Sequence, residues 1–279
     1  MSKRFLKCTV ASFLMIAVIL GAAAIPSSEK RGSSEIDNLR KWYVVYQVNG
    51  IAAHDGEAGD EMYYTQATKY LGAVFYYVIK RSGGKVETYE ASIGYRVKRK
   101  ADGRKGFVTC GHGLELTKDY YVYSNAGTTS TSVFGKIQNP ILNNNDCDAC
   151  FVYVNSGITL SDKTHGRGGS KASISPTVAT VKKGDTLYKC GSKTGVTSGE
   201  VAWAYGETYV YDDISDYRHF MKNVICFKGI SKKGDSGAPV YKKVNGKNQL
   251  VGIVICANEY STIVMDAKEI NSRLGVTPY

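Results

Sequence analysis

The stretch from Lys232 to Val240, KKGDSGAPV, holds an aspartate and a serine between two glycines. Glycine adopts backbone angles that other residues avoid, and aspartate and serine bond to nearby backbone, so the stretch suits a surface turn. It equally suits a serine whose hydroxyl attacks a carbonyl carbon. The motif alone leaves both interpretations open, and its partners elsewhere in the chain must decide between them.

A serine nucleophile needs a base that removes its proton and an acid that orients the base. The chain has four histidines, and one of them, His112, follows the strand-like run GFVTC. Asp148 precedes the apolar run ACFVYV, and Ser236 comes later in the chain. Asp146 is an alternative acid, because the two-residue period of a strand places it on the same side as Asp148. Since all these residues lie at strand edges, their side chains can project into one cleft.

The chain beyond Gly83 is a succession of short β-type runs, such as ASIGYRV, TLYKCG and LVGIVIC, separated by turn-forming clusters. This spacing predicts an all-β sandwich or barrel, whereas alternating helices would predict a parallel sheet. Only DAKEINSRLG, near the end, predicts a helix, and its glycine is a suitable stop. The stretch GRGGSKAS, from Gly166 onward, divides the β region into two halves.

The first 24 residues predict a signal peptide. Basic MSKRFLK is followed by apolar VASFLMIAVIL, and Ala22 and Ala24 offer a cleavage site. The apolar run is short for a membrane span of about 20 residues. We therefore expect a secreted, extracellular protein with no membrane span in its mature form.

Residues 25–81 differ in character from the rest, with a polar linker before strand-like and short helical patterns. They end at the dibasic pair Lys80 and Arg81, which suits processing of a zymogen, although an ordinary exposed charge pair would look the same. The sequence thus predicts a pro-segment over 25–81 and a main domain over 82–279. Its halves are expected at about 82–165 and 166–279.

Six cysteines remain once Cys8 leaves with the signal peptide: Cys110, Cys147, Cys150, Cys190, Cys226 and Cys256. An exported protein can keep disulfides, so we expect disulfide bonds or buried thiols. Cys147 and Cys150 have the spacing of zinc ligands, but no second such pair or nearby histidines accompany them. We expect no metal and no cofactor.

The net charge is +11, and it falls to +8 when Lys3, Arg4 and Lys7 leave with the signal peptide. A surplus of this size favours acidic partners without identifying one. The basic run RVKRKADGRK lacks the aromatic pattern of nucleic-acid binding and predicts a solvated hairpin. Nucleic acid is therefore not an expected partner.

The motifs GFVTCGHG, DACFV and GDSGAPV resemble the His, Asp and Ser motifs of chymotrypsin-fold serine proteases. From about Gly83 to Tyr279 the chain looks most like the secreted streptogrisin-type branch, through ASIGYRV, KCGSKTGVTSGEV and STIVMDAKEINSRLGVTPY. The resemblance implies two antiparallel six-stranded β-barrels with the active site between them, and a short C-terminal helix. It also implies a serine endopeptidase that hydrolyses protein or peptide substrates through an acyl-enzyme. We expect a monomer.

The resemblance assigns a role to each residue of the site. His112 would be the general base and then the acid, Asp148 would orient it, and Ser236 would attack. Gly234 and Ser236 would form the oxyanion hole. The Asp-Ala-x-x-Val pattern selects Asp148 rather than Asp146.

The resemblance also gives Asp235 a structural role beneath the oxyanion loop, paired with a cation. In the streptogrisin-type branch that cation is an arginine, and Lys189 occupies the similar position here. Gly113 stands where a cysteine usually follows the histidine, so the usual disulfide cannot form. Cys110 could pair with Cys150 instead.

Departures from the family concentrate in the expected substrate pocket. Ile230 replaces the aspartate of trypsin-like enzymes, Ala257 stands where glycine opens the pocket, and Val254 stands where glutamate-specific relatives carry histidine. Ile255 replaces a serine that supports the acid. These residues predict a narrow, apolar S1 pocket and an apolar P1 preference. Loss of the serine also supports an alternative, a catalytically silent relative that serves as a secreted binding module.

Overall fold

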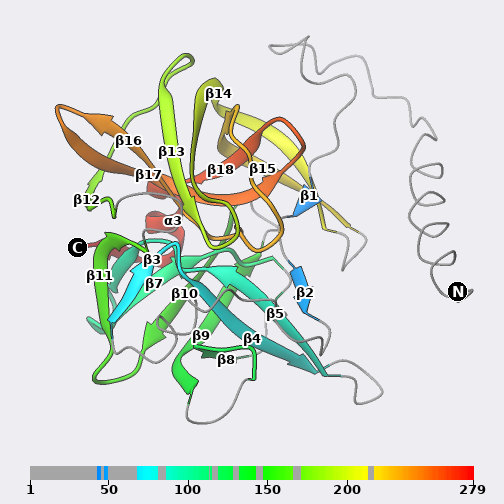
Figure 1. Ribbon diagram of the computed structural model, residues 1–279, viewed down its shortest axis with the longest axis vertical. Coiled ribbons are helices and arrows are strands. Elements are labelled where there is room, and N and C mark those ends of the chain that lie inside the picture. Colours follow the sequence, from blue (N-terminus) through cyan, green and yellow to red (C-terminus); the bar gives the residue numbers. More distant parts are fainter. Residues whose placement is uncertain are drawn as a thin grey trace, which may run out of the picture. The chain divides into compact units, whose positions relative to one another are not determined.

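The computed structural model describes residues 43–44, 47–49, 68–80, 86–112, 114, 119–127, 132–142, 147–165, 171–212 and 217–279. Most of these residues belong to strands of two large sheets, and a small two-stranded sheet and one short helix complete the described regular structure (Figure 1). The predicted all-β class is confirmed.

The first sheet has nine strands, and every pairing in it is antiparallel. In order across the sheet they are β19 (Val276–Pro278), β6 (Arg96–Arg99), β7 (Lys105–Thr109), β10 (Asp148–Val154), β9 (Val133–Leu142), β8 (Tyr120–Tyr123), β4 (Val74–Lys80), β5 (Val86–Ser92) and β2 (Gln47–Asn49). The aromatic side chains of β4, β7 and β9 pack in its core. The ring of Phe107 lies 5.4 Å from that of Phe75 and 6.2 Å from that of Phe134.

Close packing of β7 on β10 depends on a glycine. A Cβ atom at Gly106 would lie 2.0 Å from the carbonyl oxygen of Val152 and 2.6 Å from the ring of Phe151. Any larger residue would push the two strands apart. Since β7 leads into His112 and β10 begins at Asp148, this contact helps to fix the separation of the two predicted site residues.

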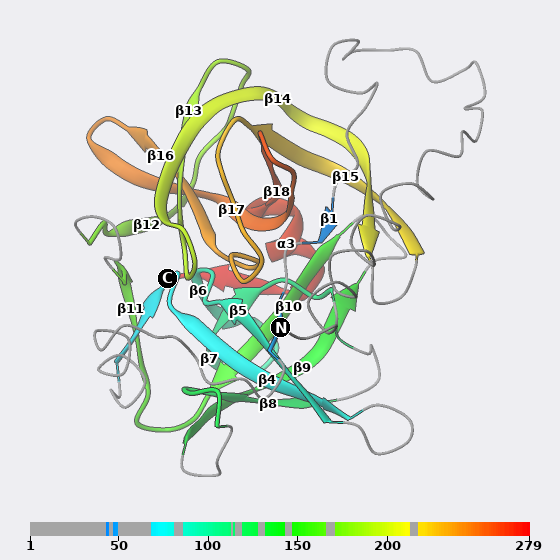
Figure 2. The same cartoon turned by 45° about the vertical axis from the view of Figure 1, so that its right-hand side comes forward.

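The second sheet has eight strands. They are β1 (Tyr43–Val44), β12 (Ile174–Val178), β13 (Thr186–Gly191), β14 (Gly195–Asp212), β15 (Tyr217–Phe227), β16 (Pro239–Val244), β17 (Lys247–Ala257) and β18 (Thr262–Asp266). Six of them form a circuit of antiparallel pairs, from β13 through β14, β15, β18, β17 and β16 back to β13. Figure 2 shows these six strands curving around a common interior.

Apolar side chains from all six strands of the circuit meet in one buried cluster: Leu187, Val201, Ile225, Phe227, Val240, Val251, Val254 and Val264, with Ala179, Val181 and Ala238. A larger cluster fills the first sheet and continues onto β17, β18 and α3 (Ala267–Leu274). The loop that carries Ser236, between β15 and β16, thus joins two strands that contribute side chains to both clusters.

The helix α3 begins and ends as its sequence predicts. The side chain of Asp266 caps the first turn by accepting hydrogen bonds from the N–H groups of Lys268 and Glu269. Gly275 ends the helix in the left-handed conformation, at φ 61°. No helix in the described part of the chain is long and apolar enough to cross a membrane.

The structure places strands on both sides of the expected boundary at Arg81. The strand β4 pairs with β5 from Val74 to Lys80, and it also pairs with β8. Just before it, β3 (Thr68–Leu71) pairs in parallel with β11 (Thr159–Thr164) in a small third sheet. The expected boundary thus falls in the connection between β4 and β5, two neighbouring strands of one sheet. The sequence pattern indicates a strand, but it does not indicate which strands lie beside it. The predicted signal peptide lies outside the described residues.

Candidate active site

His112 lies between the other two predicted site residues. Its Nδ1 is 2.5 Å from Oδ2 of Asp148, and its Nε2 is 3.0 Å from Oγ of Ser236. A carboxylate only accepts hydrogen bonds, so Nδ1 donates and Nε2 is left to accept from the serine hydroxyl. These three residues come from the end of β7, the start of β10 and the loop before β16. The alternative acid, Asp146, lies outside the described residues.

Asp148 is held by backbone donors as well as by the histidine ring. Its Oδ1 accepts hydrogen bonds from the N–H groups of Gly111 at 2.6 Å and His112 at 2.9 Å. A buried carboxylate needs such partners, because an unpaired one carries a large desolvation cost. In the family that the motifs resemble, a serine at the position of Ile255 supports the acid. Here the two N–H groups supply hydrogen bonds to Asp148 in its place.

The surroundings of His112 favour its protonated form. Burial alone would lower the pKa of the ring, but the charge of Asp148 opposes this, and the neighbouring Cys110 adds to the upward shift. The net effect holds the pKa of His112 well above its usual value of 6.5. The surroundings thus stabilise an imidazolium beside Asp148.

Ser236 stands in a loop tied to both sheets. Its carbonyl oxygen accepts a hydrogen bond from the N–H of Ser92, at the end of β5, over 2.8 Å. The N–H of Gly237 donates to the carbonyl oxygen of Val254, on β17, also over 2.8 Å. Gly237 has φ +81°, and a Cβ atom there would lie 2.0 Å from Oγ1 of Thr109. Only glycine fits beneath the serine.

Gly234 is fixed by hydroxyl groups that the sequence did not single out. Its carbonyl oxygen accepts from Oγ of Ser92 at 2.9 Å and from Oγ of Ser192 at 2.8 Å. Its φ of +99° is unfavourable for other residues, and a Cβ atom would meet the side chains of Glu90 and Lys193 within 3 Å. These last two form an ion pair of 2.6 Å, in which Glu90 is fully buried.

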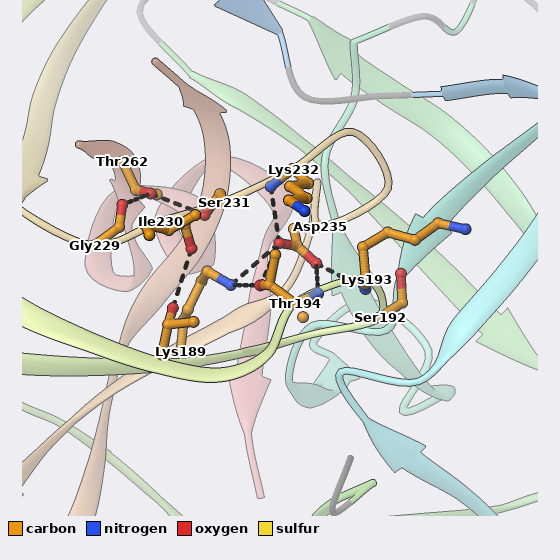
Figure 3. A network of polar contacts seen from close by, with 12 residues as sticks. Lys189, Ser192, Lys193, Thr194, Gly229, Ile230, Ser231, Lys232, Asp235 and Thr262 are labelled. Atoms are coloured by element: carbon orange, nitrogen blue, oxygen red, sulfur yellow. Dashed lines mark hydrogen bonds and ion pairs between the residues drawn. The ribbon is translucent and has the colours of Figure 1, made fainter. Parts of the chain in front are cut away.

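Asp235 has the structural surroundings that the resemblance implied (Figure 3). Its Oδ2 lies 3.1 Å from Nζ of Lys189, and both side chains are fully buried. Oδ1 accepts from the N–H of Lys193 at 2.9 Å and of Thr194 at 3.2 Å, and Oδ2 accepts from the N–H of Lys232 at 3.0 Å. The hydroxyl of Thr194 donates to Oδ2 as well and lies in close contact with the lysine. Burial lowers the pKa of Lys189, while Asp235 opposes the shift.

The expected pocket residues do not share one environment. Val254, Ile255 and Ala257 lie on β17 and are at most 7% exposed. Ile230, in contrast, lies in the loop after β15 with 57% of its surface exposed. The place of Ile230 in the substrate pocket stays a prediction.

The six described cysteines are all buried free thiols, so the structure contains none of the expected disulfides among them. Cys110 and Cys150 are neighbours, as expected, but the Sγ of Cys150 donates to the carbonyl oxygen of Cys110 over 3.1 Å. Cys150 pairs with Thr109 across β7 and β10. The contact thus joins a thiol to a backbone oxygen, and both cysteines are free.

Neither a protein-family model nor a curated protein sequence matches this chain. Solved structures do match. Protease A of Thermobifida fusca aligns with 76% of this chain and 98% of its own, at 16% identity and a TM-score of 0.57. The chymotrypsin of Cellulomonas bogoriensis covers the same shares at 19% identity and a TM-score of 0.55. A glutamic acid-specific serine protease that uses a histidine triad in substrate binding aligns with 75% of this chain and 99% of its own, at 23% identity and a TM-score of 0.54.

These comparisons confirm the fold that the motifs predicted. The chain has the chymotrypsin fold, and the matching structures are serine proteases of the streptogrisin and α-lytic type. At such low identity the likeness concerns the fold, and the chemistry must be argued from the residues of this chain.

Proposed function

We propose that this protein is a serine-type endopeptidase. The observation that carries the proposal is the continuous chain of hydrogen bonds from Asp148 through His112 to Ser236, with distances of 2.5 and 3.0 Å. Each of the three residues is at most 1% exposed and comes from a separate strand edge. A structural role for a serine hydroxyl does not require an oriented and buried acid–base pair.

The proposed reaction has two halves, formation of the acyl-enzyme and its hydrolysis, and each catalytic group acts once in each half. His112 takes the proton from Ser236 as its Oγ attacks the carbonyl carbon of a peptide bond, and then gives that proton to the leaving amine. Water, activated by the same ring, hydrolyses the resulting ester. Asp148 keeps the ring oriented and stabilises its positive charge. The N–H groups of Gly234 and Ser236 would stabilise the oxyanion, in a loop that Asp235 holds in place.

The finer features of the proposal follow the sequence. Apolar Ile255 and Ala257 on β17 support a preference for an apolar P1 residue, and no cofactor is required. The N-terminal pattern supports secretion, with proteins or peptides as extracellular substrates. A peptide-library cleavage profile tests the P1 preference: apolar residues are expected, and a preference for arginine or glutamate would contradict it.

The alternative function is that of a catalytically silent binding module. Its main support was that Ile255 stands where the family carries a serine that supports the acid. The backbone N–H groups of Gly111 and His112 fill that need, at 2.6 and 2.9 Å from Asp148. This arrangement favours the enzyme.

A serine-directed fluorophosphonate probe tests the function directly. We expect labelling of Ser236 in the full chain, incubated until its mass is constant, and loss of labelling in both Ser236→Ala and His112→Ala. Ser198→Ala, at an exposed position on β14, is the matched control and should be labelled as fast as the wild type. Peptide hydrolysis should fall by on the order of 10⁴-fold or more in the two site variants. A folded wild-type protein that is never labelled would refute the proposal.

A further inference from the structure

An ion pair that has no part in the proposed reaction joins the two sheets beside the loop of Ser236. Oε1 of Glu90, on β5 of the first sheet, lies 2.6 Å from Nζ of Lys193. Lys193 belongs to the turn between β13 and β14 of the second sheet. The side chain of Glu90 is fully buried, and that of Lys193 is 26% exposed. The pair is thus a charged link between the sheets that is largely withdrawn from water.

Both partners project from a backbone that is held in place. Glu90 lies opposite Tyr76 on β4 and opposite Gln47 on β2. The N–H of Lys193 donates to Oδ1 of Asp235 at 2.9 Å, and Figure 3 shows its side chain extending away from that carboxylate. The two sheets therefore fix the position of the ion pair relative to the loop.

The ion pair packs against Gly234. A Cβ atom at this glycine would lie 2.7 Å from Oε1 of Glu90, and 2.8 and 2.9 Å from Cγ and Cε of Lys193. Both partners thus occupy the space beside its Cα. The carbonyl oxygen of Gly234 is held separately, by the hydroxyl groups of Ser92 and Ser192.

Gly234 is the third residue of a β-turn that can take two forms. A hydrogen bond of 2.9 Å, from the N–H of Asp235 to the carbonyl oxygen of Lys232, closes the turn. Gly234 has φ +99°, and Lys233 before it is not among the described residues with positive φ, which is the pattern of a type II turn. A type I turn has a negative φ at its third residue, and its central peptide group is turned over. Both forms keep the closing hydrogen bond, so that bond does not select between them.

The central peptide group of this turn carries an N–H that the proposed mechanism needs. It joins Lys233 to Gly234, and turning it over would put the carbonyl oxygen of Lys233 where the N–H of Gly234 lies. Glycine adopts positive and negative φ about equally readily, so Gly234 does not itself prevent the change. A change in its φ would, however, move its atoms against the ion pair. The pair therefore opposes the form that loses this N–H from the oxyanion site.

We propose that Glu90 and Lys193 are positioning residues, whose ion pair keeps the turn in its type II form and the N–H of Gly234 directed at the oxyanion. This inference rests on the proposed function. Neither side chain reacts, and both act through Gly234. A buried ion pair is weak support for stability, because apolar residues of similar volume often replace one without loss. Holding the loop in one conformation is a role that such residues would not serve.

The first test removes the charges and keeps the approximate size of the side chains, in the double variant Glu90→Gln, Lys193→Met. Fluorophosphonate labelling of Ser236 at rising probe concentration separates the maximal labelling rate from the half-saturating concentration. We expect the maximal rate to fall by at least about 10-fold, toward the roughly 10²–10³-fold that loss of one oxyanion donor costs. The half-saturating concentration should not change. Slower labelling that comes from weaker probe binding alone would overturn the inference.

The matched control is the double variant Asp185→Asn, Lys242→Met. It removes another ion pair of 2.6 Å, whose partners are 12% and 19% exposed and lie just before β13 and on β16. This control should be labelled at the wild-type rate. Denaturant titration gives the unfolding midpoint of both double variants. If both lose labelling to the same extent, the loss reflects a weakened fold, and the inference is wrong.

A conservative variant and the pH profile separate positioning from a merely structural role. Lys193→Arg keeps a cation beside Glu90 at every working pH and should be labelled at close to the wild-type rate. The pH midpoint of labelling should be the same in all variants, because His112 keeps its surroundings. A loss in Lys193→Arg as large as in the double variant contradicts the inference, and so does a shifted midpoint.

The same measurements separate this inference from the proposed function. Labelling of the wild type that depends on His112, with an unchanged maximal rate in Glu90→Gln, Lys193→Met, overturns the inference and leaves the protease proposal standing. Absence of labelling in the folded wild type refutes the protease proposal, and the inference with it. A lower maximal rate in that double variant, with the control, Lys193→Arg and the pH midpoint unchanged, supports both.

Discussion

His112 concentrates the chemistry of the site in one side chain, because its two ring nitrogens face opposite partners. Donation from Nδ1 to Asp148 fixes the tautomer that leaves Nε2 available to Ser236. The backbone N–H of the same residue binds Oδ1 of Asp148, so the acid holds both the ring and its backbone. Rotation of the ring would break a buried hydrogen bond to a charged group, which costs roughly 1.5–3 kcal/mol.

The raised pKa of His112 predicts the pH dependence of activity. A protonated ring cannot accept the serine proton, so the rate must rise with pH as the ring loses its own. Because Asp148 holds the pKa well above 6.5, the midpoint of the rise should lie above that value. Fluorophosphonate labelling rates from about pH 5 to about pH 10 give the midpoint.

Asp148→Asn is the matched variant for that experiment. It removes the charge that raises the pKa, so the midpoint should move down, and it favours the wrong tautomer, so the rate should fall by on the order of 10⁴-fold. A wild-type midpoint at or below 6.5 would show that burial outweighs the acid.

The sequence singles out the three proposed catalytic residues because each is chemically distinctive in its setting. A scarce histidine in a small-residue turn and a serine between glycines carry their own signal. Ser92 and Thr109 carry none, because hydroxyl residues are common in strands and their partners are distant in sequence. Ser92 binds Gly234, 142 residues further along the chain. Only the fold brings such residues together.

At the level of elements, the turn between β13 and β14 supports the loop that carries Asp235 and Ser236. Residues 192–194 direct two backbone N–H groups and one hydroxyl toward Asp235, and Lys189 on β13 adds its charge. The loop of Ser236 is thereby anchored through the residue before the serine. Changes in this turn should affect activity even though no residue in it reacts.

Gly191, the last residue of β13, tests that anchor. A Cβ atom there would lie 2.1 Å from Oδ1 of Asp235, an atom that two N–H groups hold in place and that cannot move cheaply. Gly191→Ala should cost about 1–3 kcal/mol of stability in a denaturant titration, as overpacking does. It should also slow the labelling of Ser236.

The control is Gly127→Ala, where the added methyl group meets only Oδ1 of Asn125, at 3.5 Å. It should leave the labelling rate unchanged. If Gly191→Ala lowers stability but labels at the wild-type rate, the turn does not act on the nucleophile.

The sequence predicted strands more reliably than their assembly. The apolar and aromatic run of β4 is strand-like, yet its place in the first sheet depends on pairing with β5 and β8, which no local pattern encodes. The pairings of β1 and β2 were likewise not foreseen. Short strands of two or three residues have too few side chains to show a period.

For the whole molecule, the two sheets share one continuous apolar core that also holds α3. Five of the six described cysteines lie in this shared core: Cys110, Cys147, Cys150, Cys226 and Cys256. Their burial explains why thiols can replace disulfides here: a domain of this size buries enough apolar surface to fold without covalent links. Of the two outcomes expected from the sequence, disulfide bonds or buried thiols, the structure has buried thiols.

Thiol chemistry distinguishes free thiols from disulfide bonds. The six described cysteines are between 0% and 4% exposed, and burial raises the pKa of Cys150 and Cys256 well above the usual 9.0. Both effects suppress the reactive thiolate. In the folded protein we therefore expect none of the six to react with iodoacetamide over an hour. All six should react in guanidinium chloride without a reductant, as peptide mapping can show.

An exposed cysteine introduced at position 198, as Ser198→Cys, is the positive control and should react in the folded state. If any pair among the six reacts in denaturant only after reduction, that pair forms a disulfide, and the prediction that its cysteines are free thiols is wrong. If all six react without reduction, the stability of this fold comes from its packed core, and reducing conditions should leave its unfolding midpoint unchanged.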